Sequence, residues 1–181
     1  MSPRSVVAAV TLFCLALAAP AQAGERGLDL RGLVVGAPTT TEDVSRALGV
    51  RCGVGYRNAQ VCNGQVSFGP VSADVNAVIS PTGALRRIAL TFSSSSFEDM
   101  EDGLQKKFGK PDEAQDSQVQ NRFGARFDQR IVVWRGAGGA LMTLTQRAGT
   151  FDKSSLLFDG PEDRAHLRSI QESVSVKPSD L

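Results

Sequence analysis

The sequence predicts an α+β fold in which short capped helices accompany an antiparallel sheet. Two patterns predict it. Segments 40–49 and 96–109 each begin with a hydroxyl side chain, carry an acid three positions later and end at a glycine, as short helices do. After each segment, apolar and polar residues alternate in a way that is typical of strands with one buried face. Helices therefore alternate with groups of strands along the chain.

The first predicted helix has signals at both ends. Thr40 can cap its free amide groups, and Asp43 can bond back to the residue that precedes the helix. Gly49 supplies the left-handed residue that ends it. Its apolar face consists of Val44, Ala47 and Leu48. These signals predict a short helix with one buried side.

The second predicted helix has the same pattern and is one turn longer. Ser96 is its expected cap, Asp99 lies three residues later, and Gly109 and Pro111 end it. Its expected buried stripe consists of Phe97, Met100, Leu104 and Phe108. The two helices match at a constant offset, which is the pattern of an internal repeat.

A strand-rich stretch follows each helix. The expected strands cover 66–79, 88–92, 122–135, 141–145 and 156–158, with turns at 80–83 and 136–139. Two tandem helix-plus-sheet units, 33–92 and 93–148, are therefore a hypothesis. A last short helix is expected from Pro161, with Leu167 and Ile170 facing inward.

The N-terminus has the pattern of a cleavable secretory signal peptide, residues 1–23. Arg4 precedes an apolar run that is too short to span a bilayer, and Ala21-Gln22-Ala23 offers small residues where a signal peptidase cuts. We expect cleavage between Ala23 and Gly24 and a protein of the periplasm or the medium; the alternative is a buried N-terminal helix. The rest is expected to form one domain, 24–172, and a polar tail, 173–181.

The charge balance argues against partners that are strongly charged. The whole chain has 20 Lys and Arg against 19 Asp and Glu, and loss of Arg4 with the signal peptide makes these numbers equal. A neutral chain has no electrostatic attraction to nucleic acid or to a membrane surface. We therefore expect no nucleic-acid partner and no integral membrane span in the mature chain.

Two of the three cysteines remain after Cys14 leaves with the signal peptide. Cys52 and Cys62 enclose a short loop with two glycines, and two cysteines in an oxidising compartment usually pair. We expect a disulfide between them, with a contribution to stability somewhat under ~3 kcal/mol. The alternative is a redox or nucleophilic cysteine, for which the Cys-x-x-Cys spacing is missing.

Short motifs around the helices resemble those of small envelope domains. The segment Leu33 to Gly49 resembles the G-x-[ST]-x-x-[DE]-V-x-x-x-L-G opening of SmpA/OmlA-type outer-membrane assembly lipoproteins and beta-lactamase-inhibitor-protein-like domains. Phe97 to Pro111 resembles the L-x-x-K-[YF]-G-x-P ending of related periplasmic proteins. The resemblance implies tandem helix-capped antiparallel sheets, no cofactor, no catalysis and a sheet face that binds a protein. Phe13 before Cys14 departs from the lipoprotein pattern.

The sequence shows no pattern for catalysis, a cofactor or a metal. The single histidine, His166, lies beside Arg164 and Arg168, and this positive charge makes it a poor base and a poor ligand. Acidic clusters at 98–102 and 112–116 are expected to be solvated, with calcium binding as the alternative. No cofactor and no metal are therefore expected.

Two functions from different classes remain. The shortage of bases and nucleophiles favours a non-catalytic envelope protein that binds another, unidentified envelope protein. The alternative is a carboxylate-dependent cell-wall hydrolase, because two carboxylates suffice for glycoside hydrolysis.

Alternation along 122–134 suggests where a partner would bind. If this segment is a strand, its odd positions face one side and its even positions the other. Phe123, Ala125, Phe127, Ile131 and Val133 would then form the core. The outward face would carry Arg122, Arg126, Arg130 and Trp134, residue types that are enriched at protein interfaces. The alternatives are an ordinary solvated face with Trp134 packed under a loop, or a helix.

Overall fold

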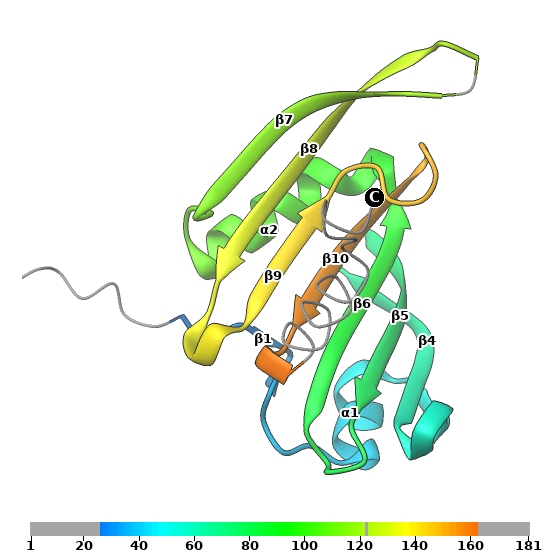
Figure 1. Ribbon diagram of the computed structural model, residues 1–181, viewed down its shortest axis with the longest axis vertical. Coiled ribbons are helices and arrows are strands. Elements are labelled where there is room, and N and C mark those ends of the chain that lie inside the picture. Colours follow the sequence, from blue (N-terminus) through cyan, green and yellow to red (C-terminus); the bar gives the residue numbers. More distant parts are fainter. Residues whose placement is uncertain (1–25, 122, 163–181) are drawn as a thin grey trace, which may run out of the picture.

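The computed structural model describes residues 26–121 and 123–162, which form two antiparallel sheets and two α-helices (Figure 1). This confirms the predicted α+β fold with an antiparallel sheet. The expected signal peptide, His166 and its neighbours, and the expected tail lie outside the described residues. Within the described part, no helix is long and apolar enough to cross a membrane.

The large sheet has eight strands in the order β3-β4-β5-β6-β10-β9-β8-β7, and all neighbours are antiparallel. Its strands are β3 (Arg51–Val54), β4 (Gln60–Phe68), β5 (Val71–Ile79), β6 (Leu85–Ser93), β7 (Glu113–Gln120), β8 (Arg126–Arg135), β9 (Leu141–Thr145) and β10 (Lys153–Asp159). A short hairpin of β1 (Asp29–Leu30) and β2 (Leu33–Val34) precedes it. The helices are α1 (Thr41–Leu48) and α2 (Phe97–Phe108).

The chain runs twice through the same order of elements. The first half is α1 followed by β3 to β6, and the second half is α2 followed by β7 to β10. The halves meet at the centre of the sheet, where β6 pairs with β10. A second unit that ends at residue 148 would omit β10, so this half extends to Asp159. A common origin of the halves stays a prediction.

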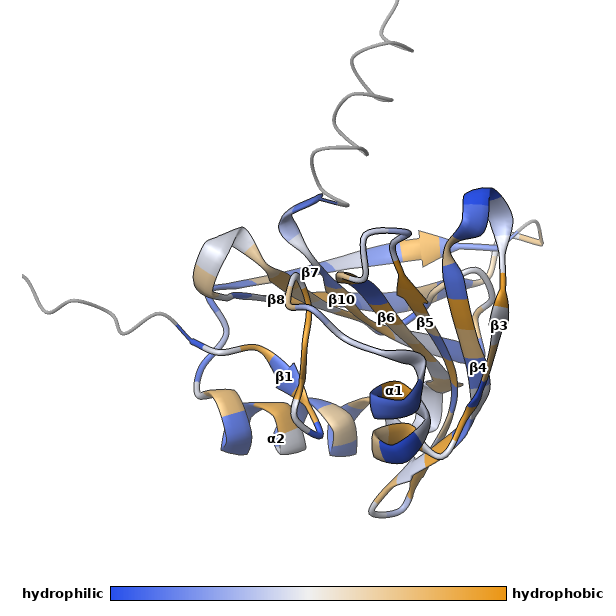
Figure 2. Cartoon of the chain, turned by 90° about the horizontal axis from the view of Figure 1, so that it is seen from below, coloured by the Kyte–Doolittle hydropathy of each residue, from blue (hydrophilic) through white to orange (hydrophobic). Residues whose placement is uncertain are grey.

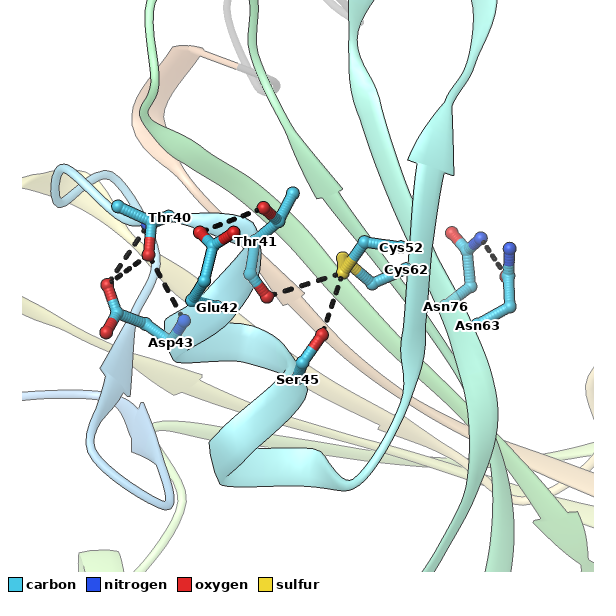
Figure 3. The surroundings of a disulfide bond; sticks show 9 residues. All are labelled: Thr40, Thr41, Glu42, Asp43, Ser45, Cys52, Cys62, Asn63 and Asn76. Carbon is cyan, nitrogen blue, oxygen red and sulfur yellow. Dashed lines mark hydrogen bonds between the residues drawn. A yellow bond between two sulfur atoms is a disulfide. The ribbon is translucent and has the colours of Figure 1, made fainter.

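Helix α1 begins and ends as its sequence predicts. The Asp43 N–H donates to the Thr40 hydroxyl, and the Thr40 N–H donates to the Asp43 carboxylate, each over 3.2 Å (Figure 3). The Thr40 hydroxyl also donates to the Asp43 carboxylate over 2.7 Å, and this bond and the one from the Thr40 N–H lower the pKa of Asp43. Gly49 follows with φ of 71°. Val44 and Leu48 are buried, so α1 has the expected apolar side.

Helix α2 ends as predicted but begins differently. A 3₁₀ turn at Ser94–Ser96 leads into the helix, and the Ser96 side chain makes no capping bond. The predicted cap at Ser96 is therefore wrong, because the preceding turn holds Ser96 at φ −100° and ψ 11° rather than in extended backbone. Gly109 ends the helix with φ of 79°. Phe97, Met100 and Leu104 are buried as expected.

Strand β8 shows its other face to the core. Val132 and Trp134 are both 0% exposed, whereas Ile131 and Val133 are only partly buried. The prediction that Trp134 points outward is wrong, because the even positions face α2. The Trp134 indole N–H donates to the Gly109 carbonyl at the end of that helix over 2.9 Å. This hydrogen bond satisfies the one polar group of a fully buried ring.

A disulfide joins Cys52 to Cys62, as predicted, across the β3–β4 hairpin (Figure 3). The two residues are direct partners in the register, with Cα atoms 3.9 Å apart. The Ser45 hydroxyl of α1 lies 3.4 Å from the Cys52 sulfur and donates to it, since a disulfide sulfur has no hydrogen. Both sulfurs are used in this bond, so neither cysteine is a free nucleophile.

Candidate functional site

Arg130, a predicted partner-binding residue, is an internal clamp. Its guanidinium donates to the Glu101 carboxylate of α2 over 3.0–3.3 Å and to both oxygens of Asp116 in β7 over 2.9 Å. Glu101 is only 8% exposed, so this pair fixes α2 against the sheet. The hydrogen bonds that Arg130 donates, first to Glu101 and then to Asp116, raise the pKa of Arg130. Its charge is already neutralised within the chain.

The other predicted residues do not meet on one surface. Arg126 is exposed near the tip of the β7–β8 hairpin, Trp134 is in the core, and Arg122 lies outside the described residues. At the tip, the Asn121 side chain accepts from the N–H groups of Phe123 and Ala125 over 3.0 Å. Phe123, expected in the core, is 80% exposed at this turn.

The helices cover only one face of the large sheet. Figure 2 shows α1, α2 and β1 on the same side of the sheet, and we term the opposite side the outer face. Apolar side chains that are neither buried nor fully exposed gather there on β5, β6 and β8 to β10. They are Val78, Ala89, Ile131, Val133, Leu141 and Leu157.

The strand register makes this apolar group continuous. Thr143 lies directly between Val133 on one side and Leu157 on the other, and Leu157 is in turn opposite Ala89. Four residues on adjacent strands therefore form one row across the middle of the outer face. Such a row offers a contact surface in which polar backbone groups are already paired within the sheet.

Paired polar side chains border the apolar row. Asn76 of β5 donates to Asn63 of β4 over 2.7 Å, and Gln65 donates to Asp74 over 3.0 Å. At the β6–β10 junction, Arg87 and Asp159 form an ion pair of 2.8 Å. The outer face thus has an apolar centre and a polar border, which is the usual anatomy of a protein interface.

The acidic cluster of residues 112–116 is held by arginines. Asp112 pairs with Arg26 over 3.0 Å, Glu113 pairs with Arg135, and Asp116 pairs with Arg130. These acids lie on or beside β7, an exposed strand that the sequence pattern does not predict. Among the described residues, no group of three or more His, Cys, Asp or Glu side chains could hold a metal ion.

A hydrolase would need a carboxylic acid whose pKa is raised. Four carboxyl groups of the described residues have a clearly shifted pKa, and in all four the shift is downward. They are Asp29, Glu42, Asp43 and Asp152. No observation on the described residues therefore favours the hydrolase.

A scan against models of protein families and searches of curated proteins and of solved structures each find no match. The resemblance to the SmpA/OmlA-type lipoproteins and the beta-lactamase-inhibitor-protein-like domains therefore stays a prediction.

Proposed function

We propose that this chain is an exported, non-catalytic envelope protein that binds another protein through the outer face of its sheet. The observation that carries the proposal is the row from Val133 through Thr143 to Leu157 and Ala89, with its polar border. Apolar surface of this kind on a folded chain favours a partner that removes it from water.

Two observations support export. The signal-peptide pattern predicts passage across a membrane, and the Cys52–Cys62 disulfide is stable in an oxidising compartment. Intact-mass measurement of protein recovered from the periplasm or the medium should give a chain that starts at Gly24. A mass that includes residues 1–23 would contradict export by cleavage, and the fraction in which the protein is found distinguishes periplasm from medium.

The binding face can be tested with a photo-reactive amino acid. Benzoylphenylalanine is placed at Thr143, in the centre of the outer face, or at Ala114, an exposed residue of β7 on the other side of the sheet. Irradiation of the expressing cells should give one discrete heavier adduct from position 143 and none from position 114. The side of Ala114 follows from Asp116, two residues later, which contacts Arg130 on the helix side.

A second variant removes the apolar contact itself. Val133→Lys places a charge beside Thr143 and should abolish the adduct from position 143, while thermal unfolding shows whether the sheet remains intact. Equal adducts from positions 143 and 114, or an adduct that Val133→Lys leaves unchanged in folded protein, would refute binding through this face.

A further inference from the structure

A cleft of about 340 Å³ lies on the helix side of the sheet. It opens between α2, the β1–β2 hairpin and the turn that joins β4 to β5. Buried side chains of the central strands, Leu90 of β6 and Leu156 of β10, lie at its base. Its volume is within the range of about 300–1,000 Å³ that is usual for small-molecule sites.

Two aromatic rings line the cleft, and each has a cation against it. The Arg31 guanidinium lies 4.9 Å from the centre of the Phe68 ring, and the Lys107 ammonium lies 4.9 Å from that of Phe108. Each contact fixes a ring and places a positive charge at the edge of the cleft. The site therefore combines an apolar interior with a charged rim, which carries these two cations and the carboxylates of Asp29 and Asp99.

The two cations differ in their partners. Lys107 pairs with Asp29 over 2.9 Å. Burial raises the pKa of Asp29, but hydrogen bonds from Lys107 and the Gly32 N–H outweigh it, so the pKa is lowered and this carboxylate stays charged. Arg31 instead donates to two backbone carbonyls, those of Ala47 over 3.3 Å and Ser67 over 2.6 Å.

Within the described part of the chain, no carboxylate forms an ion pair with Arg31. The remaining acid of the lining, Asp99, is in the first turn of α2. Arg31 is therefore the cation at this rim whose charge an anionic ligand would neutralise.

Two residues of the cleft lining stabilise the local backbone less than the residues usually found at such positions. Gly103 lies inside α2, where glycine costs about 0.5–1 kcal/mol relative to alanine, and a Cβ there would meet no atom within 4 Å. Arg31 has φ of 52°, in a hairpin turn where asparagine or glycine is favoured. Gly103 leaves the cleft open, and the turn holds Arg31 at its rim.

We infer that this cleft binds a single-chain amphiphile with a carboxylate head, such as a medium-chain fatty acid anion. The alkyl chain lies over Leu90 and Leu156 between the two phenylalanine rings, and the carboxylate accepts hydrogen bonds from Arg31. A volume of about 340 Å³ corresponds to about eleven groups of water size, at about 30 Å³ each, which is close to the size of a ten-carbon carboxylate. This site is separate from the outer face and does not depend on the proposed function.

Calorimetric titration with decanoate, below the concentration at which it forms micelles, tests the inference. Decanoate should bind at one site per chain, and decyltrimethylammonium, which has the opposite charge, should bind at least about tenfold more weakly. The same result from both compounds would show that the rim does not select an anion. Failure of decanoate to bind in the millimolar range would overturn the site.

Matched variants separate binding from stability. Arg31→Asn should lower decanoate affinity at least about tenfold, because the head group loses a charged donor. The control is Arg57→Asn, which changes another arginine with positive φ, 55°, in an exposed turn outside the cleft lining, and should leave the affinity unchanged. Equal affinities of these two variants would overturn the role of Arg31.

Gly103→Leu tests the cleft without altering its charge. The leucine side chain should fill the opening and abolish decanoate binding, while the unfolding temperature stays equal to or above that of the parent protein, since glycine is the poorer helix residue. Undiminished binding by this folded variant would place the ligand elsewhere.

Discussion

The two halves of the chain have the same order of elements but hold their helices in different ways. In the first half, α1 has a complete capping box, and its Ser45 hydroxyl contacts the disulfide of the adjacent hairpin. In the second half, α2 has no side-chain cap and contains a glycine. Contacts with β8 hold it instead, through the Glu101–Arg130 pair and the Trp134–Gly109 hydrogen bond.

This difference shows that one arrangement of elements can be stabilised locally or at long range. The capping bond of α1 and its Ser45–Cys52 contact join residues 3 and 7 positions apart, whereas the bonds that join α2 to β8 link residues 25 and 29 positions apart. A helix held by distant contacts does not need the best local sequence. The second half can therefore keep Gly103, and with it the open cleft beside α2.

The largest loss of stability is expected in the second half of the chain, from Trp134→Ala. Removal of a fully buried indole should lower the free energy of unfolding by about 3–5 kcal/mol, because it leaves a cavity between α2 and the sheet and deprives the Gly109 carbonyl of its donor. Chemical denaturation measures this. Phe123→Ala, at an 80% exposed aromatic, should change stability by less than about 0.5 kcal/mol. Similar values for the two would show that Trp134 is not in the core.

The next effect is expected in the first half, from loss of the disulfide. The Cys52→Ser/Cys62→Ser double variant should lose about 2–3 kcal/mol of stability. The disulfide closes a loop with a sequence separation of 10, and without it the unfolded chain regains the conformational entropy that this loop removes. The parent protein should show this loss only in reductant, and without reductant a thiol reagent should label neither cysteine. Labelling of both in fresh, unreduced protein would contradict the bond.

The third largest loss of stability is expected from removal of the Arg130–Glu101 ion pair, which holds α2. Arg130→Met should cost about 2 kcal/mol, because the mostly buried Glu101 loses its partner, and the partial exposure of Arg130 keeps the loss below that of a fully buried pair. Arg126→Met, at the exposed arginine of the same strand, should cost less than about 0.5 kcal/mol. A double-mutant cycle that combines Arg130→Met with Glu101→Gln should measure the coupling free energy between these two residues. Equal effects of the two arginine variants would argue against the clamp.

The smallest loss of stability is expected at the helix N-termini, where the caps of α1 and α2 can be compared. Thr40→Ala should cost about 1 kcal/mol, because it removes the capping bond of α1, whereas Ser96→Ala should be nearly neutral. An NMR titration gives an independent measurement. The pKa of Asp43 is lowered by its bonds with Thr40, so in Thr40→Ala it should rise toward its ordinary value. A larger loss from Ser96→Ala than from Thr40→Ala would invert the assignment of the caps.

The sequence alone predicted the local features of this fold. The alternation along β5 and β6 and the signals around α1 predict elements that the structure confirms. The expected strand stretch 66–79 is instead the end of β4, a turn and β5, and the start of β4 was not predicted. Strand β7 was missed because its eight residues are almost all exposed, so they carry no alternation. The face of β8 was assigned wrongly because apolar residues occupy both sides, with Ile131 and Val133 opposing Val132 and Trp134. Only the position of α2 decides between them.

The cleft was not predicted, because its lining comes from segments that are distant in the chain. Two local signals could have drawn attention to it. Gly103 interrupts an otherwise good helix, and Arg31 precedes a glycine at a turn where asparagine is preferred. Each is locally unfavourable, and such conflicts between local and global structure are expected at functional sites. The partner role of Arg130 was misassigned because the sequence does not show that Glu101 lies beside it.

The strand order also determines how the chain can fold. All but one of the strand pairs in the large sheet join strands that follow one another in the described chain, and the exception is β6 with β10. Arg87 and Asp159, which pair across that junction, are 72 positions apart. Because local pairs close short loops and form quickly, the rate of folding should depend on this one distant pairing. Hydrogen exchange during refolding should then protect the amide groups that bond within each meander, such as those between β4 and β5, before the amide groups that bond between β6 and β10.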